Sequence, residues 1–151
     1  MNIIQIIEHS HETKKAGAQT VVQKYMEYLA QHHSVHLVSF DGNSDCFSDN
    51  RTIYRKNNGH YWIWVIVSIL KLVRLFRKIQ PDIVHSHILE LSFISYVACR
   101  LTRKKLVITA HGTDIKTMNR RKRLMLNDPR VVKIVPSEHM RAELLMKIHD
   151  E

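Results

Sequence analysis

Short apolar segments alternate with longer segments of helical periodicity along this chain, and that alternation limits the folds open to it. Residues 2–7 (NIIQII) are brief and rich in β-branched side chains, which is typical of a strand. The following segment, residues 18–31, carries Val22, Met26 and Leu29 at helical spacing. The same criteria predict strands over residues 34–40, 51–56, 82–86, 105–110 and 131–136, and helices over residues 61–78, 89–101, 114–126 and 137–148.

This order predicts a single α/β domain with a Rossmann-like, doubly wound parallel sheet covered by helices on both faces. The 151 residues suffice for one buried core, and no repeat, low-complexity tract or Pro/Gly-rich linker divides them. In such sheets ligands bind outside the carboxyl ends of the strands, near the point where the strand order reverses. The residues that follow each strand are therefore the candidates for a functional site.

Histidines collect at these predicted strand ends. More than half of the 11 histidines follow a strand closely: His9, His11, His85, His87, His111 and His139. The segment PDIVHSH (81–87) ends in two of them, and their side chains are expected on the same side of a strand because they are two positions apart. They could bind metal, perform acid–base chemistry or finish the strand, and the neighbouring loops decide among these roles.

A loop of small residues precedes the first predicted helix. Ala16, Gly17 and Ala18 would let the backbone approach a ligand closely while the helix N-terminus offers free N–H groups to an anion, although a simple turn into the helix explains them equally well. The motifs G-x-G-x-x-G and G-x-x-x-x-G-K-[ST] are absent from the sequence, so dinucleotide-binding and P-loop chemistry are excluded at the level of motifs.

Four segments in order carry a family resemblance: AGAQTVVQKYMEYLAQHHSVHLVSF (16–40), LFRKIQPDIVHSH (75–87), VITAHGTD (107–114) and IVPSEHMRAELL (134–145). Through them the chain resembles the N-terminal, acceptor-side domain of family 4 glycosyltransferases of the GT-B fold. The resemblance implies transfer of a sugar from a nucleotide-sugar donor to a glycan or lipid-linked acceptor, in cell-surface polysaccharide or lipid-linked glycan synthesis. It implies no cofactor and no metal.

The resemblance also implies roles for particular residues. His111 corresponds to the catalytic-site histidine that contacts the transferred sugar, and Gly17, with Ala16 and Ala18, corresponds to the loop beside the donor diphosphate. The acceptor or sugar side is expected at His87, Gly112, Thr113, Asp114 and Ser137, whereas His85 is expected to finish its strand. The family often has two glycines followed by Ala-Glu-Arg where this chain has Ala-Gly-Ala-Gln-Thr (16–20), which weakens the diphosphate assignment.

The length of the chain matches one half of such an enzyme. Residues 1–151 are expected to form the N-terminal domain and to end before its last strand and interdomain hinge, and the donor-binding C-terminal domain has no counterpart. We therefore expect no appreciable transferase activity from this polypeptide alone, with a separately encoded donor domain as its candidate partner. The alternatives are a non-catalytic binding or partner subunit with the same fold and, with less support, a His-rich metal-binding protein.

Charge and apolar runs bear on partners and location. The formal charge of +9 favours anionic partners, but the basic stretch 119–126 lacks interleaved aromatic residues, so a solvated helix face is expected there and no nucleic acid. Cys46 and Cys99 form no CxxC pair, and the N-terminus has no basic leader, so a cytoplasmic location is expected. The apolar run 61–70 is too short to span a bilayer, yet the helix Tyr61–Lys78 could contact an anionic membrane surface or simply pack on the sheet.

Overall fold

A computed structural model of the chain describes residues 1–8, 17–42, 45–55, 59–87, 89–110 and 115–149. The strands are β1 (Asn2–Ile7), β2 (Ser34–Gly42), β3 (Cys46–Ser48), β4 (Arg51–Arg55), β5 (Ile83–Ser86), β6 (Lys105–Thr109) and β7 (Val131–Ile134). The helices are α1 (Gly17–Leu29), α2 (Tyr61–Ile79), α3 (Leu89–Thr102), α5 (Arg120–Asn127) and α6 (Glu138–His149).

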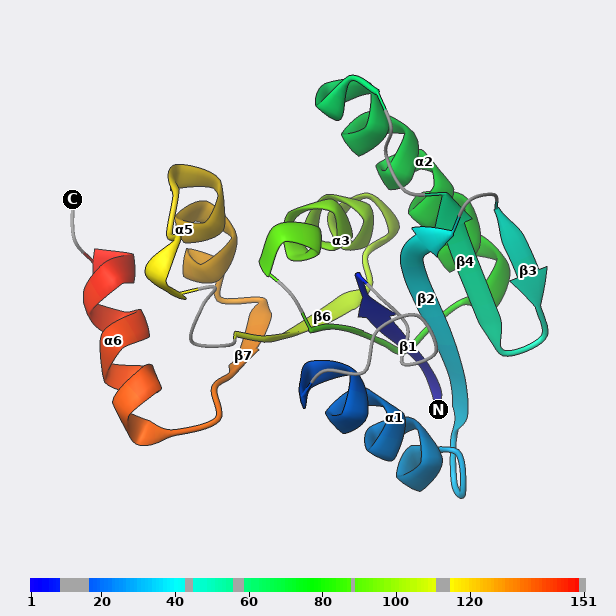
Figure 1. The fold of residues 1–151 in the computed structure, drawn as a ribbon, viewed down its shortest axis with the longest axis horizontal. Helices are drawn as coiled ribbons and strands as arrows, with labels where there is room; N and C mark the ends of the chain where they lie inside the picture. The colour runs from blue at the N-terminus through cyan, green and yellow to red at the C-terminus, as the bar shows by residue number, and fades with distance from the viewer. Residues whose placement is uncertain (9–16, 43–44, 56–58, 88, 111–114, 150–151) are drawn as a thin grey trace.

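The strands form one sheet in the order β3-β4-β2-β1-β5-β6-β7 (Figure 1), and every pair is parallel except β3 with β4. The chain moves outward from β1 first toward β2 and β4, and then returns to add β5 on the other side. The strand order therefore reverses between β1 and β5. This confirms the expected α/β, Rossmann-like architecture and fixes its switch point.

The two faces of the sheet are covered unequally. The larger core lies under α2, α3 and α5, where Ile4, Ile6 and Val84 from the central strands pack with Leu72 and Phe76 of α2. On the other face lies α1 (Figure 1), and a smaller cluster of Ile7, Val22 and Leu37 holds it there. Alternation of side chains along each strand explains the division, because neighbouring residues of a strand point to opposite faces.

The structure differs from the prediction at two elements. The edge strand β3 was not among the predicted strands, because its three residues have no apolar alternation, and in the structure all three are exposed. The helix predicted over residues 114–126 is interrupted in the structure: residues 115–116 are helical, residues 117–119 are not, and α5 begins at Arg120. The side chain of Asn119 caps α5 by accepting the N–H of Lys122 at 3.0 Å. Thr113 and Asp114 lie outside the described residues.

Candidate functional site

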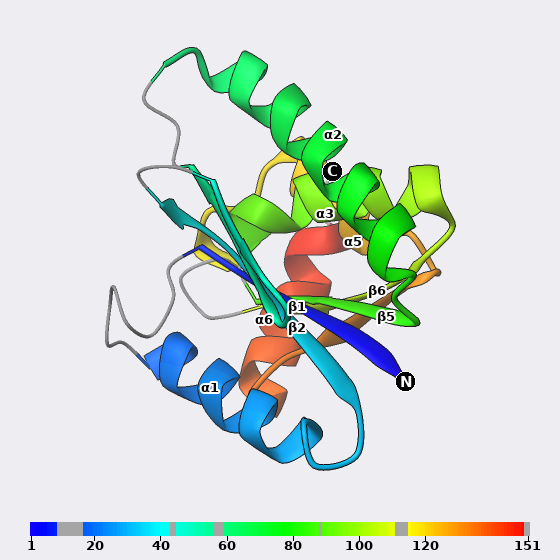
Figure 2. The ribbon, with the colours of Figure 1, turned by 90° about the vertical axis from the view of Figure 1, so that its right-hand side faces the viewer.

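The carboxyl ends of the parallel strands meet along one edge of the sheet, at the left in Figure 2. Backbone hydrogen bonds continue between the strands at this edge: Phe40 donates to the carbonyl of Glu8 (3.2 Å), His87 to that of Ile6 (3.0 Å) and Ala110 to that of Ile134 (2.9 Å). These bonds link β2 with β1, β5 with β1, and β6 with β7, and we call this edge of the sheet the rim. The switch point between β1 and β5 lies within it.

His85 and His87 lie on the α1 face at that switch point. On β5, Val84 and Ser86 point to the α3 side, where the hydroxyl of Ser92 donates to that of Ser86, so the two histidines point the opposite way. Their ring centroids are 4.0 Å apart, and the ring of Tyr25 on α1 lies 6.4 and 6.3 Å from them. The prediction that both histidines share one side of the strand is confirmed.

Each histidine has a hydrogen-bond partner on a neighbouring strand. The Nε2 atom of His85 lies 2.8 Å from the hydroxyl of Thr109 on β6, and the Nε2 atom of His87 lies 2.6 Å from the side-chain carbonyl of Gln5 on β1. Because that carbonyl can only accept, Nε2 of His87 carries a proton. The local packing expected of His85 is present.

His87 is held away from water, and His85 is partly buried. His87 and Gln5 are each 1% exposed, and burial lowers the pKa of His85 to about 4. His85 is therefore a neutral imidazole near pH 7 and does not supply a proton there. The burial of His87 makes it part of the wall of the site, and its predicted contact with a sugar stays a prediction.

The other predicted site residues are only partly described. Gly17 begins α1 at this edge. Ser137 precedes α6 and caps it, because its hydroxyl accepts the N–H of Met140 at 3.3 Å. Outside the described residues lie Ala16, His111, Gly112, Thr113 and Asp114. Their assignments stay predictions.

Gln5, Thr109 and Tyr25 belong to this cluster and were missed by the sequence analysis. The signal for Gln5 was present, because an amide in the middle of NIIQII needs a buried partner. Thr109 gave no such signal, since threonine is ordinary in a strand, and Tyr25 reaches the histidines only through the packing of α1.

A metal site receives no support from the part of the chain that is described. Within it, no group of three His, Cys, Asp or Glu side chains is arranged to hold an ion. Both Nε2 atoms of the His85 and His87 pair already have protein partners. The further ligands considered, His9, His11 and His111, lie outside the described residues.

Comparisons with known proteins identify a family match and a shared fold. Residues 16–149 match the sequence model of Glycosyltransferase Family 4, whereas no curated protein matches the chain. A glycosyltransferase from Rickettsia africae has 18% identity and a TM-score of 0.67, over 99% of this chain and 40% of its own.

Two further solved structures share the fold. A protein assigned as a UDP-N-acetylglucosamine 2-epimerase from Listeria monocytogenes has 13% identity and a TM-score of 0.69, over 99% of this chain and 42% of its own. Sucrose-phosphate synthase from Thermosynechococcus elongatus has 15% identity and a TM-score of 0.61, over 96% and 44%. The chain thus spans less than half the length of each of these proteins.

Proposed function

We propose that this chain, which belongs to glycosyltransferase family 4, forms the acceptor-side half of a nucleotide-sugar-dependent glycosyltransferase. The family match carries the proposal, because it runs from before α1 to the last helix. The fold alone discriminates less, since a protein assigned as an epimerase shares it. In the proposed reaction an acceptor hydroxyl bonds to the anomeric carbon of a hexosyl-type sugar, the carbon–phosphate oxygen bond breaks, and the nucleoside diphosphate and the hydroxyl proton leave.

The rim at the carboxyl edge supports this assignment. The N-terminus of α1 begins there at Gly17, where free backbone N–H groups suit a diphosphate. The buried network of Gln5, His87, His85 and Thr109 stiffens the strand ends behind it. In this proposal His111 contacts the transferred sugar, and His87, Gly112, Thr113, Asp114 and Ser137 form the acceptor side.

The second wall of the cleft would come from a donor-binding domain outside these 151 residues. The chain covers 40–44% of each similar structure, as one half of a two-domain enzyme would. The donor site would then be completed only when both halves are together. The proposed location is the cytoplasm, where nucleotide sugars are available and the acceptor glycan or lipid-linked acceptor is built for the cell surface.

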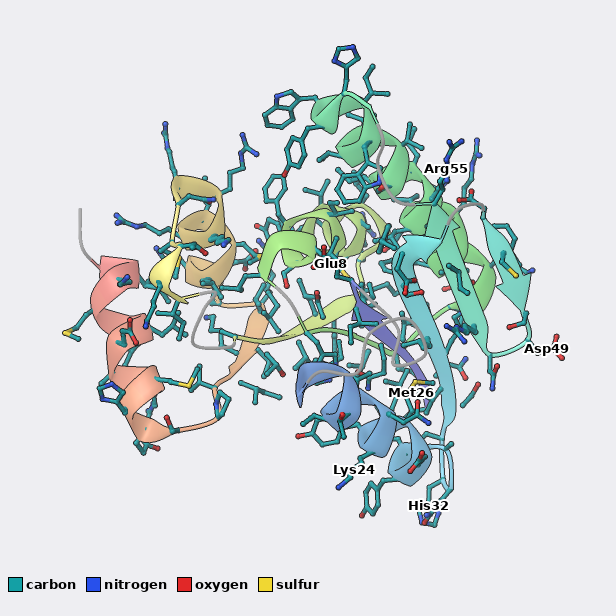
Figure 3. The ribbon with its side chains drawn as sticks, in the orientation of Figure 1. Glu8, Lys24, Met26, His32, Asp49 and Arg55 are labelled. Carbon is teal, nitrogen blue, oxygen red and sulfur yellow. The ribbon has the colours of Figure 1, made fainter. Side chains whose placement is uncertain are left out.

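Turnover of nucleotide sugars tests this function. The chain is produced alone and together with a donor domain from neighbouring coding sequence, and release of nucleoside diphosphate is measured with acceptor extract. Turnover is expected only from the pair, with at least a 100-fold loss in His111→Ala. His32→Ala, on the turn that follows α1 (Figure 3), is the matched control and should stay within twofold.

Three other results of this experiment would contradict parts of the proposal. Sugar transfer by the chain alone would contradict its role as a half-enzyme. A pair that assembles but turns over no nucleotide sugar would favour the alternative of a non-catalytic partner subunit. Equal losses in His111→Ala and His32→Ala would remove His111 from the site.

A second proposal concerns the membrane, because the outer side of α2 is apolar where a solvated helix would be polar. In Figure 1 the first half of α2 extends beyond the other elements. The exposed side chains on it are Tyr61, Trp62, Ile63, Ile66, Val67 and Leu70. Arg77 continues this side with a positive charge, and the guanidinium of Arg121 lies 4.2 Å from the centroid of the Trp62 ring.

We propose that this side of α2 rests on anionic lipid and so brings the rim to a lipid-linked acceptor. An exposed apolar patch with a cationic border has the chemistry of an interfacial helix. None of the helices built from described residues is long and apolar enough to cross a membrane, so the proposed contact is peripheral.

Vesicle sedimentation tests the contact. At low salt the chain should sediment with phosphatidylglycerol vesicles and not with phosphatidylcholine vesicles. Ile66→Asp should release it, while Leu101→Asp, with a similarly exposed side chain on α3 (61% against 58%), should not. Equal sedimentation of the two variants would remove α2 from the contact, and no sedimentation of the unmodified chain would refute the membrane proposal.

A further inference from the structure

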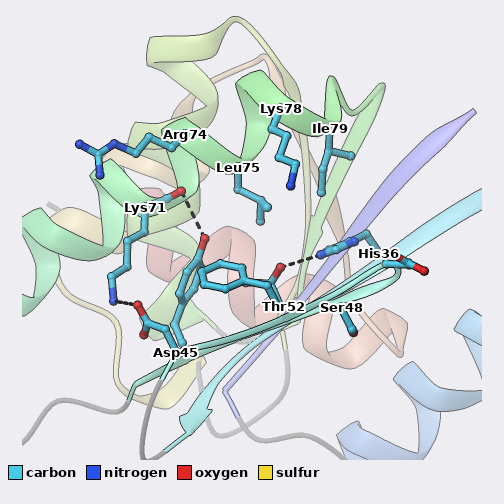
Figure 4. A pocket seen from close by; sticks show the side chains of 12 residues that line it. His36, Asp45, Ser48, Thr52, Lys71, Arg74, Leu75, Lys78 and Ile79 are labelled. Atoms are coloured by element: carbon cyan, nitrogen blue, oxygen red, sulfur yellow. Dashed lines mark hydrogen bonds and ion pairs between the residues drawn. The ribbon is translucent and has the colours of Figure 1, made fainter.

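A cavity of about 620 Å³ lies between the second half of α2 and the corner of the sheet formed by β2, β3 and β4 (Figure 4). Its volume is within the range of sites for small organic molecules. It includes His36 near the start of β2 and Lys78 in the last turn of α2. The cavity therefore lies on the α2 face and reaches toward the amino edge of the sheet, away from His85 and His87.

Three cations of α2 line one side of this cavity. Lys71, Arg74 and Lys78 are three and four residues apart, which places them along one side of the helix. The ammonium of Lys71 is paired with the carboxylate of Asp45 at 2.5 Å. In contrast, Arg74 and Lys78 form no ion pair or side-chain hydrogen bond with any residue in the described ranges. Asp49 is the other carboxylate of the lining, so the cavity has an excess of positive charge.

Buried polar groups form the floor. His36 and Thr52 are 8% and 1% exposed, and Nε2 of His36 lies 2.8 Å from the hydroxyl of Thr52. The ring of His36 also has a backbone hydrogen bond to Asp49. Figure 4 shows Lys78 extending from α2 toward this pair.

The charge state of His36 responds to what occupies the cavity. Burial lowers the pKa of His36, the backbone hydrogen bond to Asp49 opposes that effect, and the positive charge of Lys78 lowers the pKa further. An anion beside Lys78 would offset its charge and make protonation of His36 easier.

The remaining wall is apolar. Leu75 and Ile79 line the cavity from α2, and Tyr54 and Phe47 line it from β4 and β3. The ring of Phe47 is 65% exposed, so it is available to cover a ligand. Cations on one side and rings and aliphatic groups on the other describe a site for a molecule with one anionic end and one less polar end.

We propose that this cavity binds a phosphate monoester carried on a ring-sized organic body, with the phosphate between Arg74 and Lys78 and the body against Phe47 and Leu75. A phosphate monoester has a charge of about −1.5 to −2 at pH 7, which matches two unpaired cations. An arginine can also bind two phosphate oxygens at once. The site is separate from the rim, and the proposal does not depend on the transferase function.

Calorimetric titration of the whole chain tests it, with adenosine 5′-monophosphate, glucose 6-phosphate and inorganic phosphate as probes. At least one monoester should bind at least tenfold more tightly than inorganic phosphate. The double variant Arg74→Gln/Lys78→Gln should lose at least tenfold in affinity for it. Arg77→Gln, which removes a charge from the same helix outside the cavity lining, should lose less than twofold. Equal binding of all probes, or equal loss per charge in Arg77→Gln, would overturn the proposal.

The imidazole of His36 gives a second readout by NMR. Saturation with the monoester should raise the pKa of His36, and Lys78→Gln should raise it without ligand and reduce the further rise. Binding that leaves the titration of His36 unchanged would place the ligand elsewhere and overturn the assignment. Turnover by the complete transferase pair should stay within twofold in Arg74→Gln/Lys78→Gln, so failure of either proposal is recognised separately.

Discussion

Two histidine–threonine pairs in this sheet have the same hydrogen bond and different surroundings. His36 on β2 bonds Thr52 on β4, and His85 on β5 bonds Thr109 on β6, each with 2.8 Å between Nε2 and Oγ1. Both pairs join parallel neighbours, and burial lowers the pKa of both histidines. However, the rings of Tyr25 and His87 pack on His85, whereas His36 opens onto the cavity under α2.

The contrast teaches that the surroundings of a histidine, and not its hydrogen bond, separate a structural role from a binding role. At the rim, packed neutral groups exclude water and hold the strand ends together. At the cavity, Arg74 and Lys78 have no ion-pair partner in the part of the chain that is described, and they lie beside a buried polar floor. We therefore expect substitutions at the rim to change stability most, and substitutions at the cavity to change ligand affinity most.

Acidification should give the largest loss of stability, mainly through protonation of His85 at the rim. The pKa of His85 is about 4 when folded and 6.5 when unfolded, so the unfolded chain binds more protons between these values. Stability should fall by about 3 kcal/mol from this residue as the pH falls from 7 to 4. Urea unfolding across this range measures it. His85→Gln should reduce the dependence by up to one proton. An unaltered slope in His85→Gln would contradict the assignment.

Loss of the His87 ring should rank next. His87→Leu leaves the buried carbonyl of Gln5 without its donor and should lower the free energy of unfolding by about 2 kcal/mol. The double variant Gln5→Leu/His87→Leu should recover part of this loss, because both polar partners are then removed. Urea midpoints of the two variants provide the measurement. A double variant less stable than His87→Leu would show that packing, and not the hydrogen bond, holds the rim.

The sequence predicted most of the fold because its signals are local. The strand segments are short, apolar and separated by helices of regular spacing, so Asn2–Ile7 and Tyr61–Ile79 were expected almost to the residue. These local signals failed for elements whose structure depends on contacts with distant parts of the chain. The strand Cys46–Ser48 exists through its pairing with β4, and α5 begins at Arg120 although apolar periodicity suggested an earlier start.

The functional sites were likewise predicted only in part. The rule that ligands bind at carboxyl edges led to His85 and His87 from the sequence, and the structure brings those two together. The cavity could not be predicted, because His36, Thr52 and Lys78 are far apart in the sequence and meet only when α2 packs over β4. From the sequence alone, the basic face of α2 is interpreted as solvated, and only the structure shows the cavity beneath it.

Removal of each threonine hydroxyl tests whether the two pairs are energetically alike. Thr52→Val and Thr109→Val should each lower the free energy of unfolding by about 1 kcal/mol, since each leaves a histidine nitrogen without its partner. The serine variants keep the hydroxyl and serve as controls for the lost methyl group. If Thr→Ser costs as much as Thr→Val at either site, packing and not the hydrogen bond explains the effect there.

The smallest effect on stability is expected at the cavity wall. Burial alone would raise the pKa of Asp45, but the hydrogen bonds from Lys71 and from the backbone N–H of Arg55 lower it overall. Lys71 and Asp45 are partly exposed, so Lys71→Gln should cost only about 0.5 kcal/mol, and the cost should vanish as the pH falls through the pKa of Asp45. The same variant leaves the carboxylate of Asp45 in the cavity lining without its lysine partner. It should therefore weaken binding of the phosphate monoester several-fold while barely moving the urea midpoint. A large loss of stability with unchanged affinity would instead make the cavity a structural region like the rim.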